Sequence, residues 1–129
     1  MEHPIVQRVE RAREEGIQVF ADQYPYTASA TGLEAALLPR WSQAGGRDSL
    51  MARLDDPPTL ERIKEGMIEG LARRGGADRI QFRRYRPNES IEGQLLSEVA
   101  ADRDQHPIDT AIKPHQGRKR EHCLIQYER

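Results

Sequence analysis

The sequence predicts an α+β fold that is mostly helical. Apolar residues recur at helical spacing in several segments, whereas the alternation typical of strands is confined to short stretches. The chain has 129 residues, the length of a single domain, and only 36% of them are hydrophobic. Because aromatic residues make up 5% of the chain and Trp41 is the only tryptophan, we expect a small core and a marginally stable fold.

The charge balance and the cysteine count narrow the class of protein. Charged residues make up 32% of the chain, yet the net charge is −1, so the chain as a whole is not attracted to nucleic acid or membranes. No apolar stretch approaches the roughly 20 residues of a membrane span, and the N-terminus lacks the apolar stretch of a signal peptide. We therefore expect a cytoplasmic protein in which Cys123, the only cysteine, forms no internal disulfide.

The N-terminal part predicts a helix followed by a strand. Apolar residues at helical spacing, Pro4 in the first turn and Gly16 as a stop predict an amphipathic helix over 4–15. The next stretch, GIQVFAD, alternates with a two-residue period and predicts a strand over 17–22. A helix that leads into a strand through one glycine is half of a repeating α/β unit.

This strand leads into the stretch ADQYPYTASATG. The two-residue period places Phe20, Asp22 and Tyr24 on one face, and Pro25 ends the strand because it lacks a backbone donor. Enzymes of the α/β class carry functional side chains where a strand meets a loop at its carboxyl end. The same pattern also fits an ordinary strand end at which a tyrosine packs, so periodicity leaves both interpretations open.

The middle of the chain predicts two helices. A short helix is expected over 47–54, after an irregular stretch that begins beyond Thr31. A longer helix is expected over 57–73, because Asp56 is a good N-cap and Pro57 suits the first helical position. Its apolar face comprises Leu60, Ile63, Met67 and Leu71.

The C-terminal part predicts one more strand and two more helices. The stretch DRIQFRRY predicts a strand with Ile80 and Phe82 on one side. The stretch EGQLLSEVAADR predicts an amphipathic helix, and Pro107 starts a last short one. Residues 114–129 show neither clean periodicity nor a turn scheme and are locally basic, so we expect a disordered tail there.

Five side chains could in principle bind a metal ion: His3, His106, His115, His122 and Cys123. None falls in a CxxC, HxH or HExxH spacing, so we expect surface histidines and no metal site in this chain alone. Cys123 has no accompanying His/Asn pattern and is expected to be a free thiol rather than a nucleophile. The basic cluster GRKREH has no aromatic platform and is expected to be solvated, without a nucleic-acid partner.

Three stretches in sequence order resemble a known family. The segment Arg11–Trp41, followed by GGRDSLMARLDDPPTLERI, is similar to the later part of the N-acyl-D-amino-acid deacylases, the D-aminoacylase branch of the amidohydrolase superfamily. The segment Asn88–Ile112 resembles the family stretch in which an L-x-G-x-x-L-x-E-x-A pattern precedes P-x-D-T-A. The resemblance covers about residues 5–112, so the chain resembles a fragment from the C-terminal half.

The resemblance implies a fold and an activity. The family has a zinc-dependent (β/α)8 barrel that hydrolyses the amide bond of N-acyl-D-amino acids. By this resemblance, 1–26 is one helix-strand unit of the barrel, 27–90 is a lid insertion, 91–113 holds the return helices and 114–129 is the tail. Leu37, Leu38 and Trp41 are candidates for the apolar lining of the substrate pocket, with packing inside the lid as the alternative.

The resemblance also implies which residues would contact the substrate. Tyr24 matches the family tyrosine that hydrogen-bonds the bound substrate, and Asp22 and Tyr26 are further candidates. The family's metal ligands and its catalytic aspartate match no residue of this chain, as a truncated or frameshifted reading frame would produce. We therefore expect the chain alone to hold no zinc and to be inactive, although the full-length family binds zinc and a small-molecule N-acyl-D-amino acid.

Two further expectations follow. A single barrel strand has unpaired edges, so the chain is expected to self-associate through them. The alternative function is a non-enzymatic helical interaction module that binds a partner through the helix at 57–73 and the basic tail.

Overall fold

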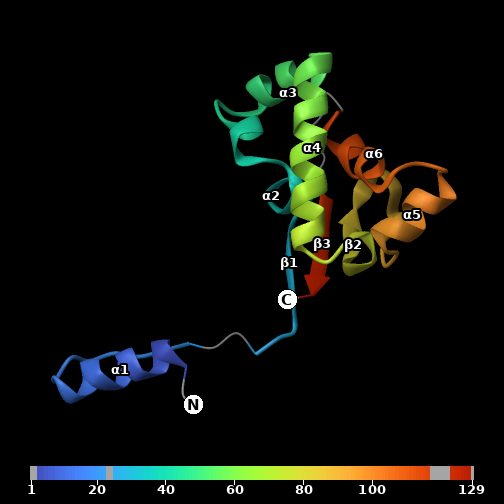
Figure 1. The fold of residues 1–129 in the computed structure, drawn as a ribbon. Coiled ribbons are helices and arrows are strands. Elements are labelled where there is room, and N and C mark those ends of the chain that lie inside the picture. Colours follow the sequence, from blue (N-terminus) through green and yellow to red (C-terminus); the bar gives the residue numbers. More distant parts are fainter. Residues whose placement is uncertain (1–2, 23–24, 117–122, 129) are drawn as a thin grey trace.

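The computed structural model describes residues 3–22, 25–116 and 123–128 (Figure 1). The helices are α1 (Pro4–Glu14), α2 (Leu33–Leu37), α3 (Arg47–Asp55), α4 (Pro57–Arg73), α5 (Leu96–Asp102) and α6 (Pro107–Ile112). The strands are β1 (Ala28–Gly32), β2 (Ile80–Tyr85) and β3 (Cys123–Glu128). Helical residues predominate and the strands form one small sheet, which confirms the predicted α+β, mostly helical class.

The sheet is antiparallel and its strand order is β1-β3-β2. The strand that comes last in the sequence therefore lies in the middle. Ile125 of β3 is opposite Thr31 on one side and Phe82 on the other. Both Ile125 and Phe82 are buried, so this register directs one face of the sheet into the core.

The prediction of a disordered tail is wrong for Cys123–Glu128, which form β3. Lys113–His115 form a 3₁₀ turn, and Cys123–Glu128 form the central strand, whereas 117–122 and 129 lie outside the described residues. Cys123 and Ile125 are buried while Leu124 is exposed, which is the alternation of a strand. The pattern spans too few residues to be recognised locally, and pairing with β1 and β2 stabilises it.

The predicted strand over 17–22 is also wrong. The structure places these residues in neither a helix nor a strand, although Arg13 Nε donates a 3.0 Å hydrogen bond to the carbonyl oxygen of Val19. Ile17 and Phe20 are 55% and 90% exposed. A strand needs a neighbour for its backbone groups, and no described strand pairs with this segment. The first strand starts instead at Ala28, where β3 supplies partners.

Helix α1 confirms the predicted N-terminal helix, but it lies apart from the rest of the chain (Figure 1). Pro4 occupies the first turn, and His3 Nδ1 accepts a 3.3 Å hydrogen bond from the backbone N–H of Ile5. None of the helix's residues, all of which are described, is buried. Its apolar residues Ile5 and Val6 are exposed. Local capping and propensity form this helix without tertiary packing.

Helix α4 confirms the predicted central helix. Asp56 Oδ2 accepts a 3.2 Å hydrogen bond from the backbone N–H of Thr59, which satisfies an amide that the first turn leaves unpaired. The buried residues of its apolar face are Ile63, Met67 and Leu71. Figure 1 shows α4 alongside the sheet, with α2 and α3 on one side and α5 and α6 on the other.

Two positions hold α4 close to its neighbours. Gly66 allows close packing, since a Cβ there would lie 2.5 Å from Cγ of Pro39. At the C-terminal end, Arg74 Nε donates a 2.9 Å hydrogen bond to the carbonyl oxygen of Ala36, and its guanidinium lies 4.2 Å from the ring centroid of Tyr127. Arg74 thus connects α4 with α2 and β3.

Of the remaining elements, α3, α6 and β2 follow the predictions, α5 starts later than predicted, and α2 forms in the stretch predicted to be irregular. Helices α3 and α6 lie where expected, and Ile80 and Phe82 of β2 are both buried. The helix predicted from EGQLLSEVAADR begins only at Leu96. The residues just before α5 pair with β2 instead. The N–H of Phe82 donates to the carbonyl oxygen of Gln94 (2.9 Å), and the N–H of Gly93 donates to the carbonyl oxygen of Phe82 (2.8 Å). Because Gly93 and Gln94 pair with β2, they are not part of the helix.

Replacing a core residue of β3 should destabilise the protein far more than replacing its exposed neighbour. Ile125→Ala leaves a cavity at a residue with 0% exposure, and we expect a loss of about 2–5 kcal/mol in the free energy of unfolding. Leu124→Ala removes a side chain that is 42% exposed, and we expect a loss below about 1 kcal/mol. Urea denaturation followed by circular dichroism measures both, and equal losses would contradict the central position of β3.

Candidate functional site

The predicted substrate-contacting residues lie in the segment between α1 and β1. Tyr24 lies outside the described residues, while Asp22 and Tyr26 on either side of it are exposed. The cavities described below are lined by other residues. The structure therefore places Asp22 and Tyr26 at the surface.

The residues proposed to line an apolar pocket have different environments. Leu37 and Leu38 are buried in the core beneath α4, which confirms the alternative of packing inside this part of the chain. Trp41 is 40% exposed, and the guanidinium of Arg62 from α4 lies 4.9 Å from its ring centroid. This stacking holds the 3₁₀ turn Arg40–Gln43 against α4.

Metal binding is not supported by the described residues. No three His, Cys, Asp or Glu side chains in the described ranges gather in a way that could hold an ion, and His122 lies outside those ranges. A zinc site needs three or four such ligands at about 2.0–2.3 Å. The described residues therefore do not fit the zinc of the deacylase family.

Cys123 is buried at the start of β3. Burial raises the pKa of its thiol to about 12. The thiolate is the nucleophilic form, so at neutral pH this side chain is a small apolar group in the core. The interpretation as an inert free thiol agrees with this environment.

His115 corrects the prediction that the histidines are at the surface. Its side chain is only 3% exposed, because it follows Ile112 and Pro114 into the core, and no described group hydrogen-bonds its Nε2. Burial lowers its pKa to about 4, a decrease that Glu34 opposes and Arg47 reinforces. The imidazole is therefore neutral at pH 7.

Glu34 and Arg47 also line a cavity of about 260 Å³, together with Gln43, Gly46 and Leu50. One wall is fixed by Gln43, whose Nε2 donates to the carbonyl oxygens of Glu34 (3.3 Å) and Leu38 (3.4 Å). The cavity thus has one acidic and one basic side chain, and both interact electrostatically with the buried, neutral imidazole of His115. This arrangement could not be predicted from the sequence, because it joins α2, α3 and the turn after α6.

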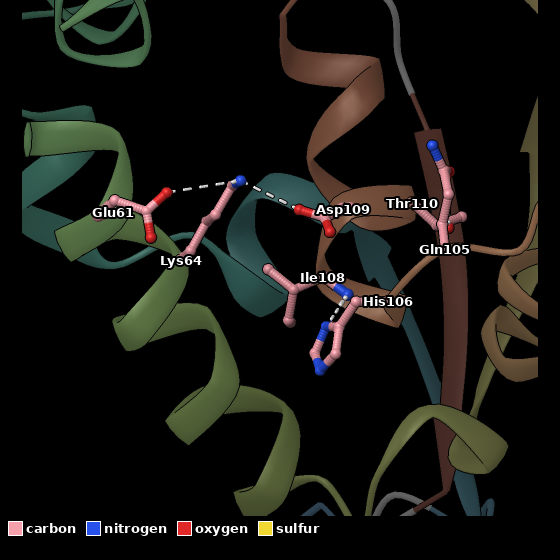
Figure 2. Close-up of polar contacts among 7 residues, drawn as sticks. All are labelled: Glu61, Lys64, Gln105, His106, Ile108, Asp109 and Thr110. Carbon is pink, nitrogen blue, oxygen red and sulfur yellow. Dashed lines mark hydrogen bonds and ion pairs between the residues drawn. The ribbon is translucent and has the colours of Figure 1, made fainter. Parts of the chain in front are cut away.

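The junction of α4 and α6 holds a second group of polar side chains (Figure 2). Lys64 Nζ lies 3.1 Å from Asp109 Oδ1 and 3.8 Å from Glu61 Oε1. His106 Nδ1 accepts a 3.1 Å hydrogen bond from the backbone N–H of Ile108 and so caps α6. The Lys64–Asp109 pair joins α4 to α6, whereas the Glu61–Lys64 pair lies within α4 and the His106 contact within the first turn of α6. In Figure 2 these contacts do not surround a common point, so we assign them to capping and helix docking.

Two further cavities lie beside β2. One, of about 160 Å³, is lined by residues that include Asp78, Arg79 and Tyr127. The other, of about 250 Å³, lies among β2, the turn Arg86–Ile91 and the C-terminal ends of α5 and α6. Neither has a sequence signature, because its walls come from segments far apart in the chain.

No helix within the described ranges has the length and apolar character needed to cross a membrane. No protein-family model, curated protein or solved structure matches the chain. The functional conclusion therefore depends on the residues themselves and on the order of the motifs that carry the deacylase resemblance.

Acid should destabilise the protein through His115. Above pH 6.5 the imidazole is neutral in both states, whereas between pH 6.5 and about 4 the unfolded state takes up a proton that the folded state does not. Stability is therefore lost as the pH falls, by about 1.4 kcal/mol per pH unit and about 3 kcal/mol in total. Urea denaturation at a series of pH values measures this loss.

The matched variants separate His115 from the other groups that titrate in acid. His115→Gln should remove most of the loss between pH 6.5 and 4, whereas His3→Gln, at an exposed histidine, should retain it. An unchanged pH profile in His115→Gln would contradict the role given to this side chain.

The thiol of Cys123 should resist alkylation in the folded protein. The raised pKa lowers the fraction of thiolate, and burial keeps the reagent away from the sulfur. Reaction with iodoacetamide at pH 8 should therefore be at least about a hundredfold slower than in 6 M guanidinium chloride. Mass spectrometry over time measures both rates. Comparable rates in the two conditions would show that β3 is not packed as described.

Proposed function

We propose that the chain is part of a zinc-dependent amidohydrolase that resembles the N-acyl-D-amino-acid deacylases, comprising one helix-strand unit of the barrel and a lid. The main observation in support of this proposal is that the chain divides near residue 27 into an exposed N-terminal part and a packed remainder. Described residues before residue 27, in α1 and 17–22, are exposed or only half-buried, whereas β1 pairs in the sheet and residues from Leu33 onward form a hydrophobic core. The resemblance places the boundary between barrel and lid at this same point.

The exposed N-terminal part is what an incomplete barrel would leave. In a (β/α)8 barrel, 17–22 would pair with neighbouring strands on both sides and α1 would cover them from outside. The apolar side chains Ile5, Ile17 and Phe20 would then be buried, whereas all three are exposed here. Their exposure supports the proposal that this end of the chain packs against further strands in the complete enzyme.

The chain's own residues have limited roles in this proposal. Tyr24 would hydrogen-bond the N-acyl-D-amino acid, with Asp22 and Tyr26 beside it. The lid would exclude water from the reaction. In the family, zinc polarises the scissile carbonyl of the substrate and activates a water molecule. The described residues do not provide its ligands. The chain alone is therefore inactive in this proposal.

The alternative interaction module has less support, because part of the surface that it would use is buried. The module would bind its partner through the helix at 57–73, and the apolar face of this helix, α4, is buried in the core. Residues 123–128 of its tail form the central strand of the sheet, whereas the basic stretch 117–122 lies outside the described residues. We therefore retain the amidohydrolase proposal alone.

The flanking DNA and an activity assay test the proposal together. We expect coding sequence for His-x-His and Ser-His-x-Lys upstream and for Ser-Asp-Gly downstream. The joined protein should bind zinc and release D-amino acid from an N-acetyl-D-amino acid, whereas the present chain with added zinc should do neither. Stoichiometric zinc and turnover by the present chain, or flanking DNA without these motifs, would refute the proposal.

A conservative variant of the joined protein tests the role of Tyr24. Tyr24→Phe removes only the hydroxyl, so we expect kcat/KM to fall about 10- to 100-fold, the cost of losing a hydrogen bond to a charged or polarised group. Tyr85→Phe, which removes the same hydroxyl on β2 outside the segment between α1 and β1, should lower kcat/KM by less than about threefold. Equal effects of the two variants would exclude a particular role for Tyr24.

A further inference from the structure

The 250 Å³ cavity beside β2 has an apolar floor and a polar rim. Phe82 and Ile91 are buried and supply the floor, and the ring of Tyr85 lines one side. Asn88, Arg103 and Lys113 supply polar and charged groups. A pocket with an apolar body and a few polar groups is the usual form of a small-molecule site.

The charge of this cavity distinguishes it from the other two. The 260 Å³ cavity pairs Glu34 with Arg47, and the 160 Å³ cavity pairs Asp78 with Arg79, so each balances one acid with one base. The lining of the cavity beside β2 includes both Arg103 and Lys113, and no Asp or Glu is among its described lining residues. Two positive charges without a lining acid favour an anion.

The polar groups are available to a ligand. Within the described residues, the side chains of Arg103 and Lys113 form no ion pair. Asn88 Oδ1 accepts from the backbone N–H of Ser90 (3.3 Å) and from Ser90 Oγ (2.5 Å), which leaves the amide NH₂ as a donor. Glu92, which could compete for the cations, accepts a 2.8 Å hydrogen bond from the backbone N–H of Tyr85.

We propose that this cavity binds a small organic carboxylate with an apolar body. The apolar body lies against Phe82 and Ile91, and the carboxylate faces Arg103 and Lys113. Arginine and lysine bind carboxylates through charge-assisted hydrogen bonds, which are the strong ones. The proposal is independent of the deacylase proposal, since it uses none of the residues between α1 and β1.

The probe is phenylacetate, titrated into the full chain at about 0.15 M salt and followed by heteronuclear NMR. We expect saturable shifts at Phe82, Ile91, Arg103 and Lys113 with a Kd of about 1 mM, a typical value for a ligand of this size. The uncharged 2-phenylethanol and inorganic phosphate should each bind at least about tenfold more weakly. The first lacks the carboxylate and the second lacks the apolar body. Equal binding of phenylacetate and 2-phenylethanol would overturn the proposal.

Matched variants locate the site. Arg103→Gln and Lys113→Gln should each weaken phenylacetate binding at least about tenfold. Arg83→Gln makes the same charge change on β2 at an exposed position outside the cavity, and it should leave the Kd within about twofold. Equal weakening by Arg83→Gln would show a general charge effect and refute the site.

Both cations also lie at helix C-caps, where a positive charge can stabilise the helix end. If that is their only role, Arg103→Gln and Lys113→Gln will lower Tm without changing the Kd, which contradicts the proposal. Where a variant fails to fold, the comparison of phenylacetate with 2-phenylethanol on the unmodified chain still decides the outcome.

Discussion

The pairing of β3 between β1 and β2 is the constraint on which the rest of the structure depends. Without β3, the other two strands would have no partner within the sheet, because β1 and β2 do not pair with each other. β3 therefore joins a segment near residue 30 to one near residue 80, and it comes from beyond the stretch that resembles the deacylases. Such long-range pairing costs chain entropy that only the complete sheet and its buried face offset.

Helix α4 uses the surface that this sheet creates. Its apolar face is buried, and Arg74 at its end contacts both Ala36 and Tyr127, so the helix connects the region around α2 with β3. The ion pair of Lys64 with Asp109 adds a link to α6, although a partly exposed pair of this kind contributes only about 0–1 kcal/mol. Burial of apolar side chains, rather than surface charge, therefore stabilises this body.

The N-terminal part has none of these supports. Helix α1 has good local signals, yet it buries no residue, and the segment after it has no strand partner among the described residues. This contrast is the physical basis of the amidohydrolase proposal, because one end of the chain is folded against itself and the other presents apolar side chains to solvent. The cavity beside β2 belongs to the folded body, so its function can be studied separately.

The capped helices α1 and α4 were determined by the sequence alone, whereas the pairing of the strands in the sheet was decided by tertiary structure. Asp56 and Pro57 begin α4 through contacts within one turn, so capping and periodicity were sufficient to predict it. For the strands, alternation is not enough. Residues 17–22 alternate but have no partner among the described residues and form no strand, whereas 123–128, for which the sequence predicts a tail, lie at the centre of the sheet. The burial of His115 and the cluster of Arg103 with Lys113 were equally unpredictable. The reason is the same in each case: these environments are made by residues distant in sequence, whereas a helix satisfies its backbone within four residues.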